Sequence, residues 1–351
     1  MSRSSGLGLG GFLVGLGAGW VVFTYFEITQ NMFSWLIIIA GIAVIAGSLI
    51  PRILPRQGIG GLMGGLVGGL ILSLFITSGF GFFTDVFDGG SLGSYKAHDT
   101  KTFNGAITGS SISLDIDNFN GPISVSTWSK DEYNVELDIR AKREEYLNDL
   151  KVDFDIMETQ PMTQSISLRY DIPSTSKSRY AIGIEVFLPT DGSINLNLVS
   201  SNGGITLSDI EGDRVYLKTS NGAFELNNVY AEEIDGETSN GALSGTFEAP
   251  NTSLSTSNGA IDLNLPCTLS GNYRLSTSNS RIDLKLSSNT QVGYDLELST
   301  SNGNINVDVP NLEYTTNQST RKVTKTENFA SKSVKITIDA DTSNGDISVD
   351  T

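Results

Sequence analysis

Copies of the tripeptide Ser-Asn-Gly recur along this chain at nearly constant spacing. Six copies begin at residues 201, 220, 239, 257, 301 and 343, and a seventh at residue 278 reads Ser-Asn-Ser. The seven asparagines are separated by 19, 19, 18, 21, 23 and 42 residues, the last distance being two periods long. Self-similarity at about 20 residues indicates a solenoid, in which each repeat buries its apolar face only by stacking on its neighbours.

The residues around each asparagine define the repeating unit. Apolar residues stand mostly four positions before it and three and five positions after it, while Ser or Thr stands two positions before it. This alternation predicts a strand, a bend at Ser-Asn-Gly and a second strand, with every other side chain pointing inward. A β-hairpin with a type I′ turn would also place Asn-Gly between alternating strands. We favour stacked coils, because hairpin turns accept several residue types whereas all seven units keep Asn.

We therefore predict an all-β, single-stranded β-solenoid, or β-helix, of about 20 residues per coil. In-register coils would place the amides about 4.8 Å apart, so each could donate to the next and accept from the one before. We expect such a ladder to satisfy buried amides, with Gly222 and its equivalents supplying a positive φ. A weaker first copy of the unit spans 110–128. The predicted ladder consists of Asn120, Asn202, Asn221, Asn240, Asn258, Asn279, Asn302 and Asn344.

The charge of the chain is unevenly distributed. The formal net charge is −16, but residues 1–83 hold three of the 23 basic residues and one of the 39 acidic residues. The remainder is strongly acidic, which argues against nucleic acid as a partner, since phosphate binding needs clustered Lys and Arg. The single cysteine, Cys267, excludes an intrachain disulfide. We expect it to be a small apolar residue of the solenoid wall.

Three apolar runs precede the repeats, at about 7–26, 33–50 and 59–83. Each is long enough for a helix that crosses a hydrocarbon core of about 30 Å. Arg3 and the basic link 51–57 predict a cytoplasmic N-terminus and an extracellular C-terminal domain. The expected localisation is therefore the plasma membrane, with several passes. A cleaved signal peptide in place of the first helix would leave this orientation unchanged.

Glycines recur every fourth position in the first and third of these runs. Small residues at this spacing let helix backbones approach closely in lipid. We expect these two runs to pack on each other or on copies in another subunit, which would give a homo-oligomer. The predicted packing residues are Gly11, Gly15, Gly19, Gly60, Gly64 and Gly68.

The remaining chain divides into three predicted parts. Residues 84–104 are predicted to form a flexible tether, and 105–193 a first coil with a cap or insertion that includes a short helix. Residues 194–351 are predicted to form the regular solenoid, interrupted by an excursion loop at 311–333 that lacks apolar rows.

These motifs resemble those of the putative-adhesin β-helix domain family, a prokaryotic family of uncharacterised function. The similar stretches are Asp-Asn-Phe-Asn-Gly-Pro-Ile-Ser-Val at 117–125, the Thr-Ser-Asn-Gly-x-Ile-x-Leu coils, and Asp-Thr-Ser-Asn-Gly-Asp-Ile-Ser-Val at 341–349. The resemblance covers about residues 105–351, implies the β-solenoid fold, and brings no catalytic residues with it. The chain departs from the pattern at Ser280 and around Gly236 and Gly245.

No constellation of residues predicts catalysis. The repeated serines have no neighbouring histidine, because the single histidine, His98, stands alone in the predicted tether. We therefore expect no enzyme activity, no cofactor and no metal. The predicted function is a membrane-anchored surface protein whose solenoid binds an extracellular ligand or envelope component, or has a structural role at the envelope. Alternatives are an envelope-stress sensor or scaffold that signals through the membrane helices and, less favoured, a polysaccharide-active enzyme.

Overall fold

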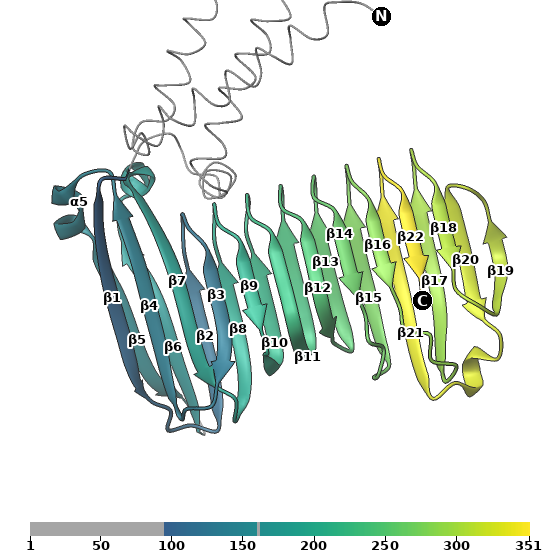
Figure 1. The fold of residues 1–351 in the computed structure, drawn as a ribbon, viewed down its shortest axis with the longest axis horizontal. Helices are drawn as coiled ribbons and strands as arrows, with labels where there is room; N and C mark the ends of the chain where they lie inside the picture. The colour runs from purple at the N-terminus through teal and green to yellow at the C-terminus, as the bar shows by residue number, and fades with distance from the viewer. Residues whose placement is uncertain (1–94, 160–161) are drawn as a thin grey trace, which may run out of the picture. The chain divides into compact units, whose positions relative to one another are not determined.

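The computed structural model describes residues 95–159 and 162–351, and these form a β-solenoid (Figure 1). Two long sheets lie face to face, and each coil contributes one strand to each. We call them sheet A and sheet B. Strand β11 (Phe224–Thr238) bends from sheet B into sheet A and joins them into one hydrogen-bonded system of 22 strands.

Sheet A is parallel in its interior and antiparallel at its ends. In spatial order it contains β5 (Lys151–Thr159), β6 (Thr163–Asp171), β2 (Ser111–Asp117), β8 (Ser193–Val199), β10 (Glu211–Lys218), the second part of β11, β13 (Asn251–Thr256), β15 (Gly271–Thr277), β21 (Val334–Thr342), β17 (Val292–Thr300), β20 (Arg321–Thr326) and β19 (Leu312–Asn317).

Sheet B is also parallel in its interior, but it is antiparallel only at its β1 end. Its spatial order is β1 (Ala97–Ala106), β4 (Glu132–Ala141), β7 (Tyr180–Pro189), β3 (Ile123–Trp128), β9 (Ile205–Ser208), the first part of β11, β12 (Leu243–Glu248), β14 (Ile261–Asn264), β16 (Ile282–Lys285), β22 (Ile347–Asp350) and β18 (Ile305–Asp308). Short helices α5 (Glu144–Asp149), η2 (Ser174–Arg179) and η3 (Phe329–Ser331) lie in the connections.

The hydrophobic core lies between the two sheets. Alternate residues of each strand point inward, as in β21, where Ile336, Ile338 and Ala340 are fully buried between exposed neighbours. In-register pairing places equivalent residues of successive coils above one another, for example Phe224, Leu243 and Ile261. The repeat therefore buries its apolar residues only by stacking, and the predicted β-solenoid is confirmed.

The order of coils in space differs from their order in sequence at both ends. The coil 111–128 lies between the coils 163–189 and 193–208. The last coil, 334–350, lies between the coils 271–285 and 292–308. Sequence spacing placed Asn344 two periods beyond Asn302. It did not show that the coil containing Asn344 lies between two coils that precede it in sequence.

Antiparallel strands cover both sheets at one end of the stack and sheet A at the other. At one end, β1 pairs with β4 over ten residues and β5 pairs with β6. The predicted tether 84–104 is therefore, from Ala97 onward, an ordered strand of sheet B. At the other end, the predicted excursion loop 311–333 forms the β19–β20 hairpin on β17. These additions protect the open edges that a solenoid would otherwise expose.

The transmembrane part of the predicted fold class is corrected by the structure. Across 95–159 and 162–351, no helix is long and apolar enough to cross a membrane. The three predicted spans, 7–26, 33–50 and 59–83, and the packing glycines in the first and third of them lie outside the described residues. The three-helix region and the multi-pass plasma-membrane localisation therefore lack structural support, and both are withdrawn.

Candidate binding surface

The seven Ser-Asn-Gly or Ser-Asn-Ser bends lie in file along one edge, which we call the Ser-Asn-Gly corner. Six of the seven asparagines donate from Nδ2 to Oδ1 of the Asn in the neighbouring coil, at 2.8 to 2.9 Å, and Asn202 at the end of the row donates to Phe119 O at 3.3 Å. The spatial order of this amide ladder is Asn202, Asn221, Asn240, Asn258, Asn279, Asn344 and Asn302. Asn120 stands outside it, because its Nδ2 donates to Tyr180 O at 2.7 Å and to Tyr95 Oη at 3.0 Å.

The amides of this ladder are exposed rather than buried. The buried polar row of the same corner consists of hydroxyls two residues earlier in each coil. Thr238 Oγ1, for example, donates to Gly222 O at 2.9 Å, and Thr256 Oγ1 to Gly241 O at 2.9 Å. The predicted burial of the asparagine amides is therefore wrong, because the short Thr side chain is the one that reaches the carbonyl inside the bend.

The corner glycines are required by close stacking, which corrects their predicted positive φ. A Cβ on Gly222 would lie 2.0 Å from Gly203 O, and one on Gly241 would lie 1.7 Å from Gly222 O. Among the described glycines, only Gly121, Gly192 and Gly245 have a positive φ. At the Ser-Asn-Gly corner, each bend therefore passes directly over a backbone carbonyl of the neighbouring bend, which leaves no room for a side chain on the glycine.

The other edge of the coils, which we call the opposite corner, is irregular. It comprises 209–210, 228–229, 249–250, 265–270 and 286–291, between a strand of sheet B and the next strand of sheet A. Glu248 is 1 % exposed there, and its carboxylate accepts hydrogen bonds from Thr268 Oγ1 and Leu269 N. Burial raises the pKa of the nearby Cys267 thiol. Cys267 is thus a buried wall residue with a left-handed backbone, φ 56°.

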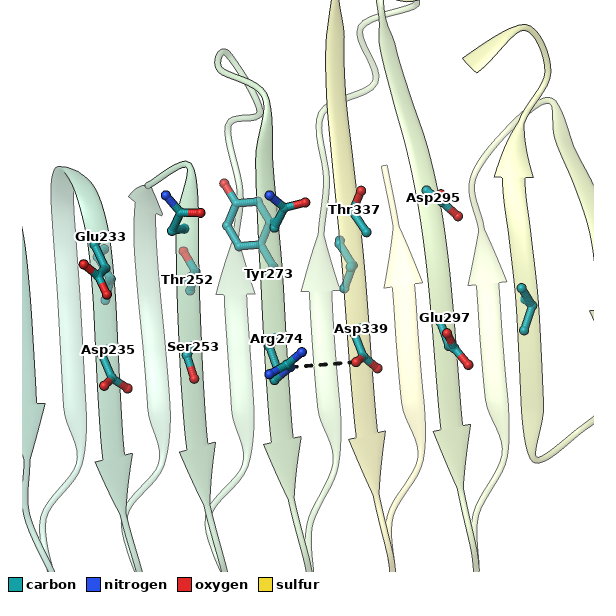
Figure 2. Close-up of a pocket in the computed structure, with 15 residues that line it drawn as sticks. Glu233, Asp235, Thr252, Ser253, Tyr273, Arg274, Asp295, Glu297, Thr337 and Asp339 are labelled. Atoms are coloured by element: carbon teal, nitrogen blue, oxygen red, sulfur yellow. Dashed lines mark ion pairs between the residues drawn. The ribbon is translucent and has the colours of Figure 1, made fainter. Parts of the chain in front are cut away.

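A shallow groove of about 600 Å³ lies on the outer face of sheet A, and we call it the sheet A groove (Figure 2). It crosses β11, β13, β15, β21, β17 and β20, and two rows of outward side chains line it in register. The first row is Glu233, Asn251, Asn272, Thr337 and Asp295. The second row is Asp235, Ser253, Arg274, Asp339 and Glu297.

The depth of the groove follows from the lengths of its side chains. On β13 the outward residues are the short Asn251 and Ser253, whereas neighbouring strands carry longer ones, such as Glu233 and Arg274. Side chains that stand perpendicular to a sheet form a low strip wherever short residues align. The strip over β13 is therefore bounded by acidic residues on one side and by Arg274 on the other.

Ion pairs neutralise the two walls of the groove. Arg214 of β10 contacts Glu233 at 2.6 Å, and on the far wall Lys325 and Arg321 of β20 contact Asp295 and Glu297 at 2.7 and 2.8 Å. In the described part of the chain, no three His, Cys, Asp or Glu side chains are arranged to hold a metal ion.

Between these walls, two opposite charges remain available. Asp235 makes no hydrogen bond or ion pair within 95–159 and 162–351, and Arg274 meets Asp339 only at 3.9 Å. The sequence prediction missed this groove, because it compared the apolar, Ser/Thr and Asn columns but not the outward columns five and seven residues before each Asn. The signal was present in the polar columns, since the second row stands five residues before the ladder asparagines and the first row seven residues before them.

These observations define the class of the protein as a two-sheet β-solenoid with a polar ladder at one corner and a polar groove on one face. Residues 192–350 match the family described as Toastrack DUF4097. This match covers the regular coils, which lie within the stretch 105–351 that carries the predicted family resemblance. No curated protein matches the chain.

Two solved structures illustrate the similarity. A putative cell adhesion protein from Clostridium sporogenes is 8 % identical, with a TM-score of 0.34, and the match covers 72 % of this chain and 99 % of that one. A putative adhesin from Bacteroides fragilis is 13 % identical, with a TM-score of 0.31, over 72 % of this chain and 97 % of that one.

Proposed function

We propose that this chain is a non-enzymatic, adhesin-like surface protein that binds an extended polar polymer across the outer face of sheet A. The observation that carries the proposal is the in-register alignment of polar side chains across the sheet A groove. Asp235, Ser253 and Arg274 stand at one height on neighbouring strands, at the strand spacing of about 4.8 Å. Such rows suit a ligand that also presents polar groups along its length.

The stacked coils support a binding role because they hold this face rigid. Three sets of hydrogen bonds hold each coil to the next. They are the backbone bonds between strands, the bonds of the buried Thr hydroxyls and the bonds of the exposed amide ladder. A surface whose side chains are already ordered loses less conformational entropy when it binds. The groove therefore needs no rearrangement to present its two rows.

The charge arrangement favours binding over catalysis. The carboxylates of Glu233, Asp295 and Glu297 each contact a basic side chain at 2.6 to 2.8 Å. A carboxylate held in this way is a poor candidate for the proton transfers that glycoside hydrolysis requires. The other two carboxylates of the groove, Asp235 and Asp339, lie three strand spacings apart, about 14 Å between Cα atoms, which is wider than the carboxyl pairs of such enzymes. We therefore propose that the groove holds its ligand unchanged.

Binding of the full-length chain to whole cells and to a polysaccharide array tests this function. Replacing the central charges by Asp235→Ala and Arg274→Ala should weaken binding at least about tenfold, a loss of about 1.4 kcal/mol. The matched controls Asp262→Ala and Lys285→Ala change exposed charges on the outer face of sheet B and should leave binding unchanged. Absence of binding to every cell and polysaccharide, or equal losses on both faces, would contradict the proposal.

A further inference from the structure

The central charges of the sheet A groove are of opposite sign and are held apart. Asp235 on β11 and Arg274 on β15 lie in one row, separated by Ser253 of β13. Two strand spacings put their Cα atoms about 10 Å apart, and the ion pair that Arg274 makes in the described part of the chain is with Asp339, at 3.9 Å. The Arg274 side chain is 77 % exposed, so its guanidinium can reach a ligand.

The surface between these charges carries hydrogen-bonding groups. Ser253 lies in the row itself, and Asn251 and Asn272 lie beside it in the first row of the groove. These side chains supply hydroxyl and amide groups that both donate and accept. The floor can therefore bind a segment rich in hydroxyl groups between its two charged ends.

Few apolar side chains are exposed on this surface. Ile234, Tyr273 and Ile338 border the groove, but they point into the core and are at most 2 % exposed, whereas Val323 of β20 is partly exposed at the far wall. Peptide recognition commonly uses pockets for apolar or aromatic side chains. The groove offers charges and hydrogen bonds instead, which favours a polyhydroxylated ligand over a peptide.

We propose that the sheet A groove selects a zwitterionic glycan segment, in which an amino sugar neighbours a uronic acid. The ammonium group pairs with Asp235, the carboxylate pairs with Arg274, and Ser253, Asn251 and Asn272 bind the hydroxyl groups between them. This inference rests on the proposed function and adds the chemical class of the ligand. A glycan with only one sign of charge leaves either Asp235 or Arg274 unmatched.

The charges around the groove bear on this selectivity. Arg214, Lys325 and Arg321 neutralise Glu233, Asp295 and Glu297, which leaves Asp235 unpaired and Arg274 paired only with Asp339, at 3.9 Å, so a ligand carboxylate must compete with Asp339 for Arg274. A purely cationic polymer meets repulsion at Arg274, and a purely anionic polymer meets repulsion at Asp235. Discrimination therefore arises from two complementary contacts and two repulsive ones.

Three forms of one oligosaccharide test the proposal. An alternating glucosamine–glucuronate oligomer with free amino groups is the zwitterionic probe, its N-acetylated form is anionic only, and its carboxyl-reduced form is cationic only. Calorimetry with the full-length chain at low salt should show that the zwitterionic form binds at least about tenfold more tightly than either other form, as one extra charged contact is worth about 1.4 kcal/mol.

Substitutions assign each charge to its partner group. Asp235→Asn should abolish the preference for the free amine over the N-acetylated form, and Arg274→Gln should abolish the preference for the carboxylate over the reduced form. The controls Asp262→Asn and Lys285→Gln, on the outer face of sheet B, should preserve both preferences.

The outcomes separate this inference from the proposed function. Equal binding of all three forms, with Asp235→Asn and Arg274→Gln without effect on selectivity, would overturn the zwitterionic site while leaving polymer binding intact. Tighter binding of a Lys- and Glu-containing peptide than of any glycan would overturn the choice of ligand class. If neither these probes nor any cell or polysaccharide binds, the proposed function itself fails.

Discussion

The two corners of the solenoid both lead the chain from one sheet to the other, but one is regular and the other is not. At the Ser-Asn-Gly corner each bend repeats the same residues, with an exposed amide ladder outside and a buried Thr row inside. At the opposite corner the connections differ from coil to coil, from the continuous bend of β11 to the six-residue segments 265–270 and 286–291.

This difference explains the uneven spacing of the repeat. Coils of 18 or 19 residues have short connections at the opposite corner, whereas the asparagine spacings of 21 and 23 residues include 265–270 and 286–291. The Ser-Asn-Gly corner has no such freedom, because Gly222 and its equivalents lie against the carbonyl of the next bend. Sequence is therefore restricted where coils touch most closely and varies where they are looser.

The largest predicted effect comes from filling the Ser-Asn-Gly corner. Gly241→Ala would place a Cβ 1.7 Å from Gly222 O, so neighbouring coils must separate. We expect a loss of about 3 kcal/mol or more in the free energy of unfolding, measured by denaturant titration. The control Gly183→Ala, whose Cβ would meet only ordinary contacts at 3.7 Å and beyond, should cost far less. Equal losses would show that close stacking is not what requires glycine.

At the opposite corner we expect a smaller loss from Glu248→Ala. This change removes the acceptor of Thr268 Oγ1 and Leu269 N, at a cost of about 2 kcal/mol. Faster alkylation of Cys267 should accompany it, because burial protects this thiol and raises its pKa. Glu211→Ala, at an exposed position, is the control. Unchanged Cys267 alkylation would mean that Glu248 does not hold this connection closed.

The buried hydroxyl row should contribute less per residue. Thr238→Val keeps the shape of the side chain but removes the hydrogen bond to Gly222 O, and we expect a loss of about 1 kcal/mol in thermal or denaturant unfolding. Thr337→Val, at an exposed position in sheet A, should change stability little. If the two variants were equally stable, the Thr row would have no structural role of its own.

Breaking the exposed amide ladder should cost less again. Asn258→Ala removes the bonds to Asn240 Oδ1 and from Asn279 Nδ2, but water can replace both partners. We expect a loss of about 0.5 kcal/mol, as for other surface substitutions. A loss larger than that of Thr238→Val would show that the ladder, and not the hydroxyl row, holds the corner together.

The smallest effect concerns Asp341, directly before the corner residue Thr342. Burial, with a smaller contribution from Asp339, raises the pKa of Asp341, so its charged form is disfavoured in the folded state. Stability should therefore increase as pH falls through this raised pKa, and Asp341→Asn should stabilise the fold slightly at neutral pH but not in acid. Melting curves at several pH values measure this difference. A variant less stable than the parent at neutral pH would contradict the assignment.

The sequence predicted the coils because their side-chain period is local. Positions such as Leu226 and Ile261 could be assigned to the core from their distance to the nearest Asn. The exchange of coils at the ends could not be predicted, because coil 334–350 has the same inward pattern as its neighbours and fits any place in the stack. The period of the side chains specifies that a coil stacks on another coil, but it does not specify which coil becomes its neighbour.

The site was less predictable than the fold. The asparagines were identified, but their exposure depends on which side of the bend each side chain takes, and the sequence pattern does not contain that choice. Asp235 and Arg274 are 39 residues apart in sequence and become partners in one groove only through the cross-strand register. A polar site of this kind requires the coils to be aligned before it can be recognised.

The interior position of the final coil also constrains biosynthesis. Strand β17 has β21 as its parallel neighbour in sheet A, and β18 has β22 in sheet B. While the ribosome is still producing the segment after Asn328, the coil at 292–308 lacks its native parallel neighbour. Residues 334–350 must therefore be translated before the coil at 292–308 can take its final place in the stack.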